Sequence, residues 1–255
     1  MQPTKSYRIW FSQRNGSTLL CKGLESTGIA GKPGEYFNLM RTDSLCAEYE
    51  VAQYEALRTK LWNLGTSQNG VFGIKHSYMT YRSETINKEV ATLQGYSYTK
   101  DSNVQELFSD LFPNCKHIFL TRRNKIRQAV SWWKAINDQV WHMEQGHTHR
   151  NDPSFYEEKY NFDALSHLFK EAALRECSIQ AYFTQYNIQP LTLVYEDFIK
   201  DFEGTIRTIV DYLEIDVDNF PIAPFFYKKT ANEQSEQWVQ RFRADLQQGW
   251  DKPAW

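Results

Sequence analysis

Four short apolar segments, each followed by a helical pattern, constrain the fold of this 255-residue chain more than any other feature. They are expected to be strands at residues 7–12, 70–75, 116–121 and 191–195. Strands that alternate with helices favour a central parallel sheet with helices on both faces. Because no Pro-, Gly- or Ser-rich linker divides the chain, the sequence predicts a single α/β domain over residues 1–255.

Apolar residues at spacings of three and four predict the helices that connect these strands. They are expected at residues 17–27, 44–64, 84–94, 103–111, 125–142 and 163–186, then from the fourth strand to residue 213 and at residues 233–248. Residues 144–161 are polar and are expected to form a loop. Parallel sheets of this kind bind ligands at the carboxyl ends of their strands, so residues suited to chemistry are expected there.

Composition and charge argue against several classes of protein. The net charge of −2 provides no basic field for nucleic acid. No apolar run approaches the roughly 18–20 residues that span a bilayer, and the first residues lack the apolar core of a signal peptide. The four cysteines show neither a CxxC pair nor metal-ligand spacing, which indicates reduced thiols in a cytoplasmic protein without a metal. His147 and His149 leave a metal site as the alternative.

The segment between the first strand and its helix carries signals for anion binding. Gly16 lets the backbone approach a ligand closely, and Ser17 and Thr18 begin a helix whose free amides suit phosphate or sulfate. Arg14 adds a cation before the glycine, with Asn15 between them. The Walker pattern is absent, because Ser17 stands where its lysine would be. The segment predicts a phosphate-binding loop, with an ordinary capped turn as the alternative.

The other three strands also end on polar residues. Arg123 follows the third strand and offers fork-like donors suited to phosphate, and Ser131 lies two helical turns further along. Lys75 closes the second strand, where a cation can face charge that develops during a reaction. Tyr195 ends the fourth strand. The alternatives are structural: Arg123 and Lys75 could be solvated surface cations, and Tyr195 could be a packed ring.

These motifs resemble those of sulfotransferases that use 3′-phosphoadenosine 5′-phosphosulfate as donor. Further stretches resemble the bacterial trehalose 2-sulfotransferase family. Those stretches are 21–31 with 34–37, 70–75, 127–135 with 140–141, and 238–243. The resemblance covers nearly the whole length in consistent order. It implies a P-loop-like sulfotransferase fold, 3′-phosphoadenosine 5′-phosphosulfate (PAPS) as donor, no metal, a small-molecule or sugar acceptor such as trehalose, and often a homodimer.

The resemblance also implies roles for individual positions. Residues 14–18 match the loop that holds the 5′-phosphosulfate, and Arg123 with Ser131 matches the 3′-phosphate motif. Tyr195 matches a residue beside the adenine, and Lys75 matches a lysine that reaches the transferred group.

A basic stretch before the last helix helps to hold the nucleotide in the family, and Lys228 and Lys229 stand there in this chain. Some positions depart from the family pattern. Asn15 replaces a serine, Lys125 replaces a proline, and Thr230 and Asn232 replace glutamine and aspartate.

Glu35 and His76 are the two candidates for the general base. The family's base is the glutamate of a Gly-x-Pro-x-Glu-Tyr-Phe loop, which maps onto Glu35. His76 directly follows Lys75, so in an extended strand the two side chains point to opposite faces. We therefore expect a catalytic set of Glu35, Lys75 and Arg14.

Aromatic side chains are expected to contact the acceptor, with Tyr36 and Phe37 as the first candidates. Trp132, Trp133 and Trp141 also suit a sugar face, although the helical spacing of Trp133 and Trp141 is typical of a core. The acceptor stays open between trehalose, another sugar, a glycolipid and a small alcohol. A nucleotide kinase on the same sheet, or a nonenzymatic nucleotide-binding module, remains the alternative function.

Overall fold

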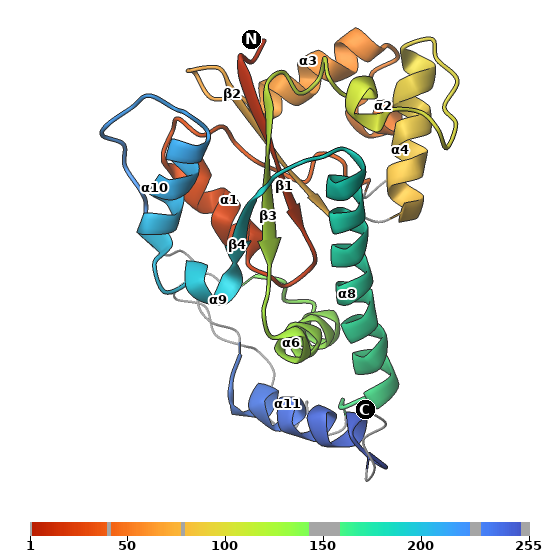
Figure 1. Ribbon diagram of the computed structural model, residues 1–255, viewed down its shortest axis with the longest axis vertical. Coiled ribbons are helices and arrows are strands. Elements are labelled where there is room, and N and C mark those ends of the chain that lie inside the picture. Colours follow the sequence, from red (N-terminus) through yellow and green to blue (C-terminus); the bar gives the residue numbers. More distant parts are fainter. Residues whose placement is uncertain (1, 40–41, 78–79, 143–158, 225–230, 251–255) are drawn as a thin grey trace.

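The structure is a computed structural model that describes residues 2–39, 42–77, 80–142, 159–224 and 231–250. Its centre is a four-stranded sheet in the order β2-β1-β3-β4, with every neighbouring pair parallel (Figure 1). The strands are β1 (Lys5–Phe11), β2 (Val71–Ser77), β3 (Cys115–Thr121) and β4 (Leu191–Val194). The predicted α/β class and all four predicted strands are confirmed, with strand ends that differ by at most two residues.

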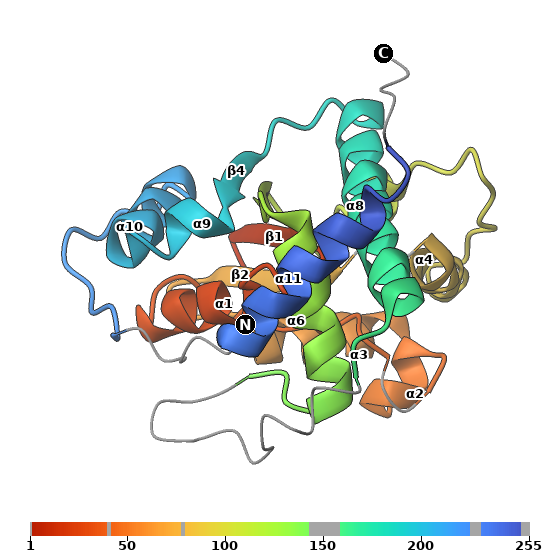
Figure 2. The same ribbon diagram turned by 90° about the horizontal axis from the view of Figure 1, so that it is seen from below.

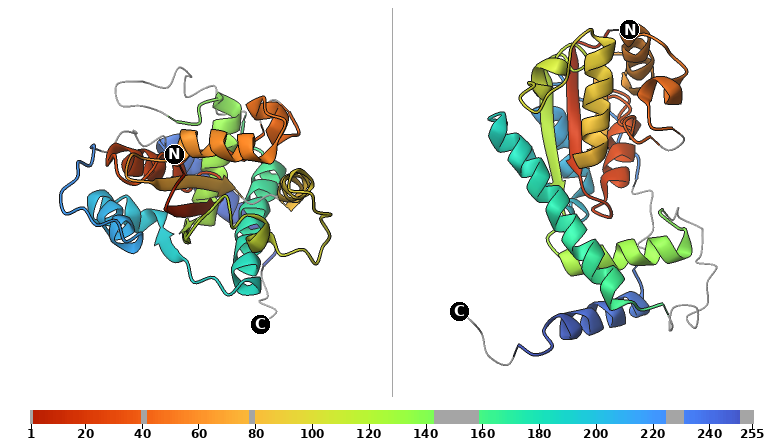
Figure 3. Two further views of the ribbon diagram at one scale, coloured as in Figure 1. Left: turned by 90° about the horizontal axis from the view of Figure 1, so that it is seen from above. Right: turned by 90° about the vertical axis from the view of Figure 1, so that its right-hand side faces the viewer.

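Helices cover both faces of the sheet, as Figure 3 shows from above and from the side. Apolar residues of α1 (Ser17–Ser26) and α10 (Phe202–Tyr212) pack on one face, together with α9 (Tyr195–Phe198). The other face is covered by α2 (Leu45–Tyr49), α3 (Tyr54–Gly65), α4 (Thr80–Leu93), α5 (Val104–Leu107) and α8 (Phe162–Gln185). In the described ranges, no helix combines the length and apolarity needed to cross a membrane.

Two further helices lie below the carboxyl ends of the strands. These are α6 (Lys125–Asp138) and α11 (Glu233–Leu246). They pack with α8 around a separate apolar cluster that includes Val130, Leu165 and Phe242. Figure 2 shows α11 crossing beneath α6 (Figure 2). The carboxyl ends of the strands therefore face α6 and α11. A site is expected among the loops between the sheet and these two helices.

Several predicted helices are shorter or divided in the structure. The helix expected at 103–111 is reduced to α5. The helix expected at 44–64 is two helices, α2 and α3, because Glu50 caps α2 in a left-handed conformation with φ of 56°. Gln139 ends α6 in the same way, four residues before the predicted end. The helix expected after β4 is divided into α9 and α10, and Asp201 starts α10 by accepting a hydrogen bond from the Gly204 amide.

The loop after β1 lies at the point where the chain order of the sheet reverses. β2 lies on one side of β1 and β3 on the other, so the chain segments that follow β1 and β2 lead to opposite sides of β1. Ligands of parallel sheets bind at such a point. Two contacts fix it. Asn15 Nδ2 donates to the Leu120 carbonyl at 2.5 Å, and Gln128 Nε2 donates to Ser12 Oγ at 2.8 Å. The loop is thus held by contacts with both β3 and α6.

Candidate functional site

The loop between β1 and α1 exposes backbone amides at the predicted anion site. Gly16 adopts φ of 88° and is the N-cap of α1, and no side chain caps the first turn. A Cβ at this position would lie 2.7 Å from Cδ2 of Tyr195. Only glycine accommodates both the left-handed backbone and the close ring. The free amides of α1 therefore remain available for an anion.

Two guanidinium groups lie beside this loop. Arg14 donates from Nε to Ser131 Oγ at 3.1 Å, and its Nη1 donates to the Trp141 carbonyl. Arg122 donates to the Arg14 carbonyl at 3.0 Å and lies 4.7 Å from the centroid of the Tyr195 ring. Burial, followed by the nearby Arg122 charge, lowers the pKa of Arg14 to about 10. Two partly desolvated cations side by side favour an anionic ligand.

Arg122 was not predicted as a site residue, whereas its neighbour Arg123 was. Its signal is the second arginine at the same strand end. Arg122 Nε is buried and has no hydrogen-bond partner in the part of the chain that the structure describes, although Glu196 Oε1 lies 3.9 Å away. Such an atom costs free energy unless a ligand or water satisfies it, so it supports an anion at this position.

Arg123 lies apart from Ser131, although both were predicted for one phosphate. Its guanidinium donates to Asp197 at 2.7 and 3.4 Å, and its amide donates to Glu196 at 2.9 Å. Its side chain is 61% exposed. Ser131 instead bonds Arg14. The two halves of the predicted 3′-phosphate motif therefore do not contact each other.

Lys75 and Glu35 form an ion pair at the end of β2. Lys75 Nζ lies 2.7 Å from Glu35 Oε1 and donates to Thr18 Oγ1 at 2.9 Å. Asn38 Nδ2 donates to the other carboxylate oxygen of Glu35 at 3.1 Å. The Lys75 amide donates to the Gly34 carbonyl at 3.0 Å, which holds the Glu35 loop along the strand. The predicted base and the predicted lysine therefore meet beside the first turn of α1.

His76 faces away from Lys75, as the predicted alternation requires. β2 continues to Ser77, with Lys75 in register with Ile9 and His76 with Trp10. The imidazole stacks on Trp10 with ring centroids 5.2 Å apart. Its Nδ1 is bonded to Arg8 Nη2 at 2.9 Å. Burial, followed by the Arg8 charge, holds the pKa of His76 well below its usual value.

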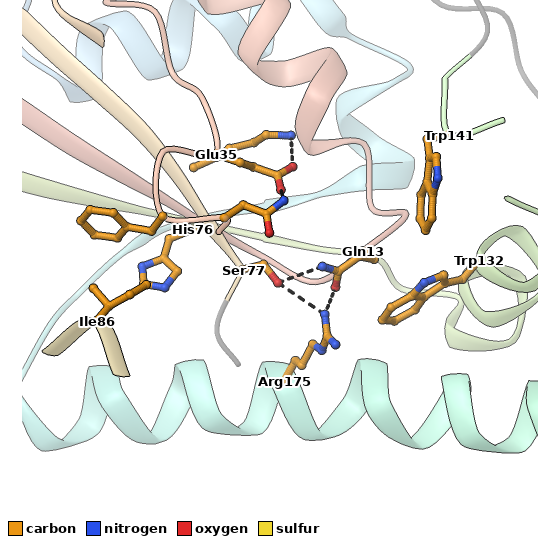
Figure 4. Close-up of a pocket in the computed structure, with 11 residues that line it drawn as sticks. Gln13, Glu35, His76, Ser77, Ile86, Trp132, Trp141 and Arg175 are labelled. Atoms are coloured by element: carbon orange, nitrogen blue, oxygen red, sulfur yellow. Dashed lines mark hydrogen bonds and ion pairs between the residues drawn. The ribbon is translucent and has the colours of Figure 1, made fainter. Parts of the chain in front are cut away.

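A cleft of about 180 Å³ opens between these groups (Figure 4). It is lined by Gln13, Glu35, Phe37, Asn38, Lys75, His76, Ser77, Ile86, Trp132, Trp141 and Arg175. Figure 4 shows Arg175 rising from α8 towards Gln13 and Ser77. The mixture of carboxylate, cations, amides and rings suits a small, hydroxyl-rich molecule.

One part of the cleft is lined by three polar residues that were not predicted and that are joined by hydrogen bonds: Gln13, Ser77 and Arg175. Gln13 Nε2 donates to Ser77 Oγ at 2.9 Å, and Arg175 Nη1 donates to Gln13 Oε1. The Arg175 guanidinium also lies 5.0 Å from the centroid of the Trp132 ring. Arg175 sits in the middle of a long helix, so no local sequence signal marks it.

The predicted aromatic residues are divided between the cleft and its surroundings. Phe37 lines the cleft, whereas the Tyr36 hydroxyl donates to the Lys32 and Leu64 carbonyls and the residue is not part of the lining. Trp141, for which a sugar face and a core position were both open, lines the cleft and is 41% exposed. Trp133 donates to the Lys159 carbonyl at 2.7 Å and packs beside the α6–α11 cluster.

Several predicted positions cannot be placed in the site. Lys228, Lys229 and Thr230 lie outside the described residues, as do His147 and His149. Asn232 caps α11 and accepts a hydrogen bond from Lys134 at 3.1 Å. In the described part of the chain, no three His, Cys, Asp or Glu side chains gather as metal ligands do.

Comparison with known proteins gives matches along nearly the whole chain. A trehalose 2-sulfotransferase of Mycobacterium tuberculosis is 25% identical over 94% of this chain and 95% of its own length. A trehalose 2-sulfotransferase of Mycolicibacterium smegmatis is 26% identical over 95% of this chain and 96% of its own. The crystal structure of a sulfotransferase from Alicyclobacillus acidocaldarius aligns over 96% of this chain and 93% of its own, with 14% identity and a TM-score of 0.49.

The model of one protein family covers the sheet, the loop after β1 and the whole cleft. This model, described as Stf0 sulphotransferase, matches residues 6–245. The chain therefore belongs to the Stf0 sulphotransferase family of transferase enzymes.

Proposed function

We propose that this sulfotransferase moves a sulfuryl group from PAPS to a hydroxyl of a carbohydrate, with trehalose as the first candidate. The Lys75–Glu35 ion pair of 2.7 Å carries the proposal, because it places a proton acceptor and a cation together beside an anion-binding loop. The names of the two mycobacterial relatives support trehalose. A glycolipid or another small alcohol is the alternative acceptor.

The residues around the loop fit a nucleotide that carries two anionic groups. Gly16 leaves room for the backbone to approach the 5′ end, and Arg14 and Arg122 supply charge there. The Tyr195 ring against Gly16 offers a flat face to a base. Arg123 would exchange Asp197 for the 3′-phosphate, with Ser131 close to Arg14. Asn15, Ser17, Thr18, Lys228 and Lys229 complete the nucleotide set by resemblance.

The chemistry follows from the placement of charge. Glu35 accepts the proton of the attacking hydroxyl, whose oxygen forms a bond to sulfur. The bond between sulfur and the 5′-phosphate oxygen breaks, and its electron pair stays on the phosphate. Lys75 and Arg14 offset the negative charge on the oxygens involved. Lys75 lies between Glu35 and Thr18, so it reaches both the base and the first turn of α1.

Glu35→Gln tests the base. The glutamine keeps the shape of the side chain but cannot accept the proton, so kcat should fall about 100-fold or more. Donor binding should stay nearly unchanged. The measurement is transfer of radiolabel from PAPS to trehalose.

Glu25→Gln is the matched control, because Glu25 is a surface carboxylate on α1 that pairs with Lys22. His76→Ala should keep most of kcat at saturating acceptor. Normal turnover by Glu35→Gln, together with a dead His76→Ala enzyme, contradicts the assignment. Transfer from ATP in place of PAPS would favour the kinase alternative.

Three wider expectations stay proposals. The single domain over residues 1–255 is supported by one continuous sheet and by the family match. The cytoplasmic location is supported by four unpaired cysteines. The homodimer rests on resemblance, and light scattering tests it.

A further inference from the structure

A buried arginine lies directly behind the cleft. Arg8 of β1 is 4% exposed, and none of the described carboxylates pairs with it. Its guanidinium lies 4.3 Å from the Trp10 ring and 5.0 Å from the Phe112 ring. Its Nη2 contacts Nδ1 of His76 at 2.9 Å. A buried cation that is held by rings and an imidazole calls for a role beyond packing.

Arg8 fixes the tautomer of His76. A guanidinium has donors and no acceptor, so Nδ1 of His76 must accept the hydrogen bond. The proton of the neutral ring then sits on Nε2. The ring cannot turn freely, because it stacks on Trp10 at an interplanar angle of 13° and meets the edge of Phe37 at 89°.

The protonated nitrogen of His76 has no hydrogen-bond partner among the described residues. Nε2 makes no hydrogen bond within the described residues, and His76 keeps 8% of its surface exposed. The side chain lines the cleft that also holds Glu35 and Lys75 (Figure 4). A fixed N–H at the edge of a cleft is a donor that awaits an acceptor atom.

We propose that His76 positions the carbohydrate by donating a hydrogen bond from Nε2–H to one of its oxygens, and that Arg8 holds the tautomer that makes this possible. The oxygen is not the one that attacks sulfur, so Glu35 remains the base. The identity of the ligand rests on the proposed function. The tautomer rests on the contacts of Arg8 alone.

Long-range ¹H–¹⁵N correlation spectra of the uniformly ¹⁵N-labelled, ligand-free protein test the tautomer. Signals of His76 are assigned by their loss in His76→Gln. At pH 7 the expected pattern is a neutral ring with the proton on Nε2. A ring with the proton on Nδ1, or on both nitrogens, overturns the inference. Since no substrate is present, this result is independent of the proposed reaction.

Kinetics with two substitutions test the donor. In His76→Asn the amide oxygen can still accept from Arg8, but no donor reaches the position of Nε2. The KM for trehalose should rise about five- to tenfold, with kcat and the KM for PAPS little changed. In His76→Gln the amide nitrogen reaches as far as Nε2, so most of the loss should be recovered.

His117→Asn is the matched control. His117 is equally buried on the neighbouring β3, accepts from Trp10 Nε1 at 2.9 Å, and is not part of the cleft lining. The KM of His117→Asn for trehalose should match that of the wild type. Equal effects of His76→Asn and His117→Asn, or of His76→Asn and His76→Gln, overturn the donor role. If the wild type sulfates no carbohydrate, the proposed function fails while the tautomer spectrum still stands.

Discussion

Three cations in or near the cleft are paired with protein side chains. Lys75 holds Glu35, Arg175 holds Gln13 and Glu171, and Arg123 holds Asp197. An anion that binds to Lys75, Arg175 or Arg123 must therefore replace a protein partner. This exchange costs least where the existing pair is exposed, because water already screens it.

Arg123 is the residue for which that exchange is easiest. Arg123→Ala should weaken binding of 3′-phosphoadenosine 5′-phosphate about ten- to hundredfold, because a charge-assisted contact to the 3′-phosphate is lost. Binding of AMP, which lacks that phosphate, should not change. Isothermal titration calorimetry with both nucleotides measures the difference.

Arg127→Ala serves as the control for Arg123. Arg127 is the third residue of α6, has a side chain that is 40% exposed, and pairs with Glu236 on α11. Its removal should leave both nucleotides unaffected. If the wild type binds AMP as tightly as the bisphosphate, no 3′-phosphate site exists at Arg123.

At the scale of elements, the turn from β1 into α1 depends on one glycine. Gly16→Ala places a side chain in a left-handed conformation and within 2.7 Å of Tyr195. The strain and the overlap should together cost about 2–3 kcal/mol. For a chain of this size the melting temperature should fall by roughly 4–12 °C. Differential scanning calorimetry measures it.

Gly28→Ala separates the two contributions. Gly28 has φ of 72°, but a Cβ there meets nothing within 4 Å. Gly28→Ala should lower the free energy of unfolding by about 1 kcal/mol, from backbone strain alone. In a Tyr195→Ala background, Gly16→Ala should cost no more than Gly28→Ala. If Gly16→Ala and Gly28→Ala lower the free energy of unfolding equally in the wild-type background, the Tyr195 side chain moves aside without cost.

Strands were more predictable than helix ends for a physical reason. A buried parallel strand is a short apolar run between breakers, and this signal is local. The break between α2 and α3 depends on the left-handed Glu50, while apolar spacing continues across it. Periodicity alone therefore joins the two helices.

The same contrast applies to the site. Gly16 lies in the short loop between β1 and α1, and Lys75 lies in the last residues of β2, so both are close to the carboxyl ends of strands. Arg175 and Arg8 are placed by contacts with Gln13 and His76, which are far from them in sequence. No pattern within α8 or β1 marks them, so they follow from the tertiary structure alone.

For the molecule as a whole, one face of the sheet contains two histidines that must stay neutral. His76 accepts from Arg8, and His117 accepts from Trp10. Burial and then the Arg8 charge lower the pKa of both, that of His117 to about 3. The unfolded chain has an ordinary histidine pKa of about 6.5, so below that pH the unfolded state binds more protons. Stability is therefore complete above about pH 6.5 and falls as the pH decreases towards the folded-state pKa.

The loss at pH 5.5 should be about 1.4 kcal/mol for each of these histidines, because each is then protonated when unfolded and neutral when folded. Most carboxylates still carry their charge at this pH and contribute little. Urea unfolding at pH 7.5 and pH 5.5 measures the decrease. In His117→Asn, where the amide oxygen can still accept from Trp10, the decrease should be smaller than in the wild type by about the contribution of one histidine. An unchanged decrease would show that His117 is protonated in the folded protein, against the lowered pKa that its burial requires.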